Sequence, residues 1–254
     1  MRKFGRATLM LVVMVGLVGC GTTRELMKNR KKCVVVWSEG TAPKNVYPND
    51  INGAIAEGLR DSLKNWEVVT AGLNDPDQGL PDELLNRCDV LVWWGHQRHG
   101  NVQDEVVDKI EKLVKEKGMG FIALHSSHFA KPNKRLMNDA CSFSVYRGDS
   151  TTLKITVSDA SHPITKGVSK EFTLDHSERY SDPYVVPKAE AIVLDGVAAL
   201  KDGGKDPSHQ GYCWTIGKGR MFYFQVGHET NPVYFDKNIR KIMANAVEWA
   251  AEGQ

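Results

Sequence analysis

Short runs rich in apolar residues recur along the first half of the chain, and the first of them is unbroken. They cover residues 33–37, 66–71, 89–94 and 119–124, and polar or glycine-containing stretches separate them. Runs of this length without alternation are typical of strands that are buried on both faces of a parallel sheet. The pattern therefore predicts four buried strands in this half of the chain.

Between these runs, apolar residues recur every three or four positions, which predicts amphipathic helices. The expected helices cover residues 51–63, 81–85 and 102–114, and Gly118 closes the last of them. Strands that alternate with helices imply right-handed crossovers and a parallel sheet. We therefore expect an α/β fold with a doubly wound, mainly parallel sheet of the flavodoxin-like kind.

The second half of the chain has a different character. Residues 151–157, 191–194, 212–216 and 220–224 read as strands, and a final helix is expected from about 236 to 251. Glycines between the last two strands are typical of a hairpin. We expect an added β-rich segment that completes the same sheet and does not form a separate domain.

Composition and charge exclude one class of function. The 254 residues carry a net charge of only +2, so nothing indicates a nucleic-acid partner. At the N-terminus, basic residues precede an apolar run at 7–18 and then Gly19-Cys20, as in a secretory signal. Because Leu17 to Cys20 resembles a bacterial lipobox, we expect a signal peptide over 1–19, acylation of Cys20, a tether over 20–32 and an exported, membrane-anchored lipoprotein. A plain cleaved signal peptide or an uncleaved anchor is the alternative.

Four further cysteines lie beyond the expected anchor, at positions 33, 88, 141 and 213. Their spacing matches no zinc ribbon, and no CxxC pattern occurs. An exported protein can hold disulfides, and a Cys33–Cys88 pairing is conceivable because both residues start expected strands. Free buried thiols are the equal alternative.

Histidines follow the ends of three apolar runs. LVWWGHQRHG (91–100) contains His96 and His99, FIALHSSHFA (121–130) contains His125 and His128, and His228 follows the run at 221–227. In open parallel sheets, ligands bind at the carboxyl ends of the strands. We therefore expect the five histidines to share one site. His162 is a sixth histidine of interest, with no such placement.

Imidazole can bind a metal, move protons or hydrogen-bond a sugar hydroxyl. His96 and His99, together with His228 or Glu229, could supply a ligand set for a divalent ion such as zinc or manganese. HxxH spacing does not distinguish among these ligand sets, so the question of whether a metal binds stays open. Glu229 is also a candidate to bind substrate.

Other residue types near the histidines could contact or transform a ligand. Ser126 is expected to be a helix cap or a ligand hydrogen bonder. Lys131 and Arg135, on one helical face, could hold an anionic or polyhydroxyl ligand. Alternation would leave one of two adjacent tryptophans, Trp94, free to stack on a sugar. Glu178 is the separate carboxylate best suited to acid–base catalysis.

Several long segments resemble the ThuA-like family, which is named for trehalose utilisation. They include DVLVWWGHQRHG, the stretch ending in FIALHSSHFAKPNKRLM, SHPITKGV, and the C-terminal segment that begins GYCWTIGKGRMFYFQVGHET. The similarity runs from about residue 33 to the C-terminus, so we expect one domain over 33–254. It implies a fold like that of class I glutamine amidotransferases. It also implies a role in the catabolism of trehalose, related disaccharides or keto-sugars.

The resemblance also implies which chemistry is absent. Amidotransferases carry a nucleophilic cysteine after the corresponding strand, in a pattern like CxGH, whereas this chain has His125-Ser126-Ser127-His128 there. Glutamine hydrolysis through a thiolate is therefore not expected.

The resulting hypothesis is acid–base catalysis on a sugar, such as enolisation or isomerisation beside a carbonyl, with a metal as an optional aid. The candidate catalytic residues are His96, His99, His125, His128, Glu178 and His228. A non-catalytic carbohydrate-binding lipoprotein and a metal-dependent hydrolase are the alternatives. The expected partners are a sugar or keto-sugar and, through the anchor, a membrane, and the question of a homo-oligomer stays open.

Overall fold

The structure is a computed structural model that describes residues 30–253. Residues 1–31 and 32–254 form two separate units, and the second is described below. The expected signal peptide, Cys20 and most of the tether lie outside the described residues and stay predictions. In the part of the chain that the structure describes, no helix is long and apolar enough to cross a membrane.

One mixed sheet organises the described chain. Its strands run in the spatial order β2-β1-β3-β4-β9-β8-β7-β5-β6. In chain order they are β1 (Lys32–Ser38), β2 (Trp66–Gly72), β3 (Val90–Trp94), β4 (Gly120–Leu124), β5 (Ser142–Val157), β6 (Glu171–Val185), β7 (Ala191–Ala199), β8 (Lys205–Ile216) and β9 (Gly219–Phe224).

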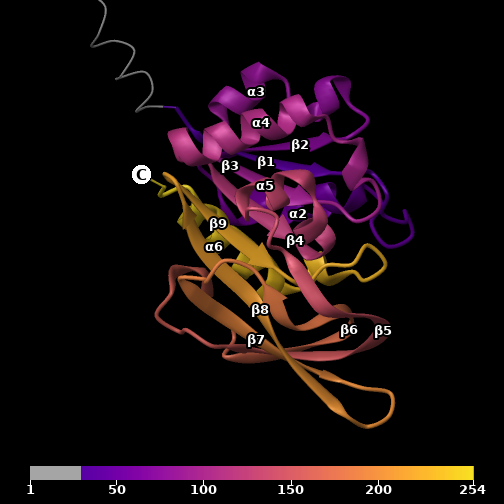
Figure 1. The fold of residues 1–254 in the computed structure, drawn as a ribbon. Coiled ribbons are helices and arrows are strands. Elements are labelled where there is room, and N and C mark those ends of the chain that lie inside the picture. Colours follow the sequence, from indigo (N-terminus) through magenta and orange to yellow (C-terminus); the bar gives the residue numbers. More distant parts are fainter. Residues whose placement is uncertain (1–29, 254) are drawn as a thin grey trace, which may run out of the picture. The chain divides into compact units, whose positions relative to one another are not determined.

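The sheet changes direction halfway across. Strands β2, β1, β3, β4 and β9 pair in parallel, whereas β9, β8, β7, β5 and β6 pair antiparallel. Strands β5 to β8 extend the sheet away from helices α3 (Asp82–Arg87) and α4 (Asp104–Lys112), as Figure 1 shows. The α/β fold and the continuation of one sheet by the second half are confirmed. The long strand β6 was not expected from the sequence.

Helices cover both faces of the parallel half. Side chains of α2 (Asp50–Ser62) and α6 (Lys237–Ala250) pack with Val34 and Val36 in one buried cluster. Helices α3 and α4 pack with Val35 in a second cluster, together with α5 (Lys131–Leu136). Because successive strand residues point to opposite faces, an unbroken apolar run serves both clusters. The four cysteines in the described chain are buried, and no disulfide joins Cys33 to Cys88, so that pairing is wrong.

Gly120 lets helix α6 approach strand β4 closely. A Cβ atom at this position would stand 2.7 Å from both Cβ and the backbone oxygen of Ala250. Because backbone cannot yield as a flexible side chain does, we expect Gly120→Ala to destabilise the protein by about 1–3 kcal/mol. Urea unfolding would measure the loss. Gly100→Ala is the matched control, since no atom lies within 4 Å of the added methyl, and equal losses in both variants would contradict this account.

Candidate functional site

The carboxyl ends of three parallel strands lie side by side. Trp94 of β3 is in register with Leu124 of β4, which is in register with Phe224 of β9. The histidines that follow these strands therefore emerge at one edge of the sheet. Their ring centroids are 4.8 Å apart for His96 and His228, and 5.5 to 5.9 Å apart for the two pairs that include His125.

His125 occupies the sharp turn directly after β4. It is fully buried and has a φ of 50°, in the left-handed region that residues other than glycine adopt only at a cost of about 1–3 kcal/mol. The ring Nδ1 donates to the backbone oxygen of Gln225 at 2.8 Å, and the Tyr223 hydroxyl donates to the His125 carbonyl at 2.9 Å. These bonds hold the strained residue in one orientation.

The other nitrogen of His125 meets a carboxylate. Its Nε2 lies 2.8 Å from Oε2 of Glu178, and the Tyr180 hydroxyl is 3.4 Å from the same nitrogen. Since a carbonyl already accepts the proton on Nδ1, the contact between Nε2 and Glu178 requires one further proton, which the two groups share. Burial raises the pKa of Glu178, but the hydrogen bond and nearby charge of His125 outweigh it and hold that pKa below its usual range.

His96 is oriented by a second carboxylate. Its Nδ1 donates to both oxygens of Glu229, at 2.7 and 2.9 Å, and the Gln97 amide donates to Glu229 at 2.8 Å. The hydrogen bond that His96 donates to Glu229 raises the pKa of His96. Burial raises the pKa of Glu229, but the bond to His96 and other local interactions lower it to about 2. Both shifts favour the ionic form of the pair, and Nε2 of His96 makes no hydrogen bond to any residue that the structure describes.

His228 completes the cluster from the segment after β9. Trp94 Nε1 donates to the carbonyl of the preceding Gly227 at 2.9 Å, which fixes the start of this segment. The Thr230 N–H donates to Nδ1 of His228 at 3.2 Å, so the ring proton stays on Nε2, which lies 3.5 Å from Oε2 of Glu178. Burial, followed by the charge of His125, lowers the pKa of His228.

Glu39 was not expected from the sequence and holds the turn that carries His96. It follows β1 and is fully buried. One carboxylate oxygen accepts three backbone N–H bonds, from residues 96, 97 and 98, at 2.8 to 2.9 Å. Gly95 is required beside it, because a Cβ there would lie 2.8 Å from the other oxygen. An acidic residue at the carboxyl end of the first parallel strand was the signal that could have revealed it.

Three predicted histidines lie outside the centre of the cluster. His99 turns its Nδ1 toward Glu39, at 3.4 Å, and burial lowers its pKa. His128 is fully buried below the turn, where its Nδ1 donates to the His125 carbonyl at 3.1 Å and burial lowers its pKa to about 3. His162 precedes the short helix η5 (Pro163–Thr165), where its Nδ1 accepts from the Ile164 N–H.

The residues expected to bind substrate are placed differently from the prediction. The free ring expected for Trp94 is wrong, since the residue is fully buried. Lys131 and Arg135 pair with acidic side chains of α4, at 2.7 to 2.9 Å, and not with the histidines. Ser126 does lie at the cluster, where its Oγ is 2.5 Å from the Tyr180 hydroxyl. Tyr180 itself was missed because strand β6 was not expected.

One group among the described residues has the composition of a metal site. His96, Glu178 and His228 each offer a ligand atom, and these atoms lie within 4.8 Å of one another. Glu178 thus takes the place that the sequence analysis considered for His99. The group reaches solvent, because the three side chains are 26%, 22% and 17% exposed.

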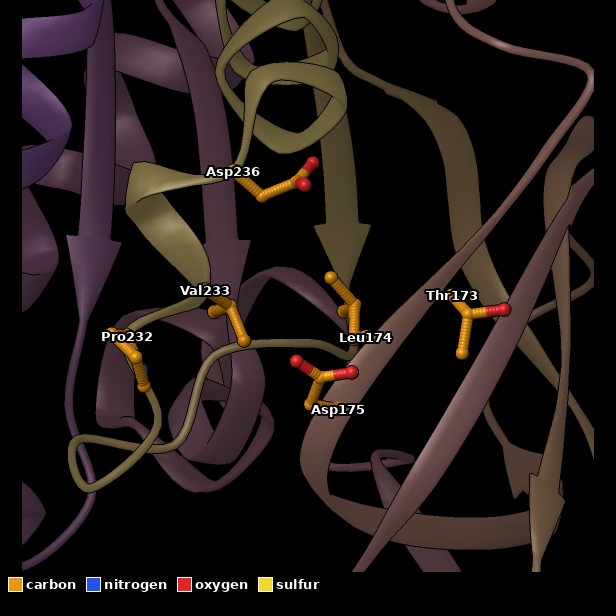
Figure 2. Close-up of a pocket in the computed structure, with 6 residues that line it drawn as sticks. All are labelled: Thr173, Leu174, Asp175, Pro232, Val233 and Asp236. Atoms are coloured by element: carbon orange, nitrogen blue, oxygen red, sulfur yellow. The ribbon is translucent and has the colours of Figure 1, made fainter.

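Two hollows elsewhere on the surface do not include the cluster. One, of about 300 Å³, lies between β6 and the start of α6 (Figure 2). Its Asp236 caps that helix by accepting from the N–H groups of Asn238 and Ile239. The other, of about 660 Å³, is lined by residues of the segment 157–170 and contains His162. Neither brings together the residues predicted for catalysis.

Comparison with known proteins supports the family resemblance. The family model described as "ThuA: Trehalose utilisation" matches residues 33–250. A ThuA-like protein from Parabacteroides merdae has a similar structure, with 14% identity and a TM-score of 0.63 over 88% of this chain and 90% of that one. A glutamine amidotransferase from Thermotoga maritima gives 12% identity and a TM-score of 0.54 over 89% of this chain and all of that one. These likenesses show the fold, and no curated protein matches the sequence.

Removal of the Glu39 carboxylate should loosen the turn that carries His96. We expect Glu39→Ala to cost about 3–5 kcal/mol, because it leaves three N–H groups without an acceptor. Glu39→Gln keeps one acceptor oxygen, so it should cost about half as much. Chemical unfolding of both variants gives the comparison. If alanine proved no worse than glutamine, the hydrogen bonds to the turn would not be what Glu39 contributes.

Proposed function

Since the chain belongs to the ThuA family, which is implicated in trehalose utilisation, we propose that it transforms a disaccharide or keto-sugar by acid–base catalysis. The observation that carries the proposal is the pair of buried His125 and half-buried Glu178, 2.8 Å apart. A strained turn holds the imidazole, and a backbone carbonyl fixes its tautomer. Strain of this kind collects at functional sites, where it orients a reactive group.

In the proposed reaction, Nε2 of His125 is the atom that moves a proton. Glu178 gives the proton that it shares with Nε2 to the carbonyl oxygen of a keto-sugar, and the freed Nε2 takes the proton of the adjacent carbon, which gives an enediol. Nε2 then returns its proton to the former carbonyl carbon, and Glu178 takes the proton of the other hydroxyl as it becomes the new carbonyl. Glu178 holds the charge of the protonated ring, and Tyr180 is within reach to donate to a sugar oxygen. His228, whose Nε2 lies 3.5 Å from the same Glu178 oxygen, stands on the solvent side of this pair.

A cysteine mechanism has no support in this arrangement. The turn after β4, where the resemblance to amidotransferases places a nucleophile, presents an imidazole. Cys141 is buried near Asp139, and burial raises its pKa, which disfavours the reactive thiolate.

The test is proton exchange on the sugar. The full chain is incubated in D₂O with keto derivatives of trehalose and related disaccharides, and NMR follows deuterium uptake beside the carbonyl. The unmodified disaccharides are incubated in parallel and report hydrolysis only. We expect uptake by the parent protein and a loss of roughly 10²–10⁴-fold in His125→Asn. Asparagine tolerates the left-handed backbone of this turn but cannot accept the proton. Glu178→Gln, nearly the same in shape, should also lose rate.

His162→Ala is the matched control, because it removes an imidazole far from the cluster and should exchange at the parent rate. Full activity of His125→Asn would contradict the proposal. Binding heat without product would favour the carbohydrate-binding alternative. Release of two monosaccharides, abolished by chelator, would favour the metal-dependent hydrolase.

A further inference from the structure

We propose that His96, Glu178 and His228 form the binding site for one divalent transition-metal ion of the zinc class. Two histidines and one glutamate are the ligand set of several catalytic zinc sites, in which water or substrate fills the remaining position. The role of the ion in catalysis rests on the proposed function, because the ion would lie in the same site. Binding of the ion itself can be tested without any sugar.

The spacing of the donor atoms suits such an ion. Zinc holds nitrogen and oxygen ligands at about 2.0–2.2 Å in a tetrahedral arrangement, which places them about 3.4 Å from one another. Nε2 of His228 and Oε2 of Glu178 are 3.5 Å apart. All three donor atoms lie within 4.8 Å, so small side-chain rotations bring them onto one centre.

In both imidazoles the second ring nitrogen, Nδ1, has a hydrogen-bond partner, as is usual for metal-binding histidines. Glu229 accepts from Nδ1 of His96, which leaves Nε2 for the ion. A metal on Nε2 of His228 moves the ring proton to Nδ1, where the Thr230 hydroxyl oxygen stands 2.7 Å away and can accept it. The longer contact from the Thr230 N–H, at 3.2 Å, is given up in exchange.

Charge favours occupation by a cation. The carboxylates of Glu178 and Glu229 lie on either side of His228, with Oε2 atoms 3.5 and 3.6 Å from its Nε2. Two carboxylates therefore face the proposed position of the ion from different segments of the chain. A divalent ion offsets both and reduces the cost of burying them.

His125 is not needed as a ligand and stays available as the base. Its Nε2 contacts the same Glu178 oxygen that faces His228. An ion in the proposed site would therefore polarise a sugar carbonyl oxygen next to the group that removes the proton. The solvent-facing side chains of His96, Glu178 and His228 leave the open position on the side from which a sugar can enter.

The experiment is a metal titration of the full chain after treatment with chelator. Zinc content is measured after dialysis, and the affinity by competition with a chromophoric chelator. We expect one ion per chain. Glu229→Gln, which changes only the support of His96, should weaken binding roughly 10–100-fold. His96→Ala, His228→Ala and Glu178→Gln remove ligands and should weaken it further.

His162→Ala is the control for adventitious binding and should keep the parent affinity. Thermal unfolding with and without zinc checks that each variant folds and reports binding independently, since an ion bound only to the folded state raises the Tm. Unchanged affinity in His96→Ala and His228→Ala would overturn the metal site and leave the proposed function standing. Stoichiometric zinc without any sugar exchange would support the metal site and overturn the proposed function.

Discussion

The parallel pairing of β3, β4 and β9 is the constraint on which the rest of the site depends. It sets Trp94, Leu124 and Phe224 in one row, so the next residues of three distant segments must emerge together. The apolar cores on both faces hold this register, because a shift of one residue would turn every buried side chain toward the wrong face. The cluster is thus assembled by the same packing that stabilises the sheet.

Register alone does not orient an imidazole. Carboxylates that accept hydrogen bonds from the rings, or from the turn that carries one of them, set the orientation. Glu39 holds the turn before His99, Glu229 holds the ring of His96, and Glu178 faces both His125 and His228. Burying these charges costs free energy, which hydrogen bonds to N–H groups and imidazoles offset. A group of acids and imidazoles at a sheet edge contributes less to stability than an apolar core would, and it gives each ring a defined tautomer instead.

Sequence patterns predicted every strand of the parallel half and part of each of β5, β7 and β8, but they missed β6. Strands β1, β3 and β4 read as largely apolar runs, whereas β6 mixes acids, serines and aromatics. Without that strand, Glu178 could be nominated as a carboxylate but not placed, and Tyr180 was overlooked. The sequence also placed histidines at strand ends, but it did not show which way each side chain points. His99 and His128 therefore seemed equivalent to His96 and His125, although one faces Glu39 and the other is buried.

The turn after β4 shows how one backbone can serve different chemistry. A left-handed residue directly after a central strand projects its side chain beyond the sheet, which is what a nucleophile requires. Here the same strained position carries His125, and the cost of its φ is met by the bonds from Tyr223 and to Gln225. The bond to Gln225 fixes a proton on Nδ1 and turns Nε2 toward Glu178. The geometry that exposes a nucleophile in one protein can therefore present a base in another, so the fold by itself does not decide the reaction.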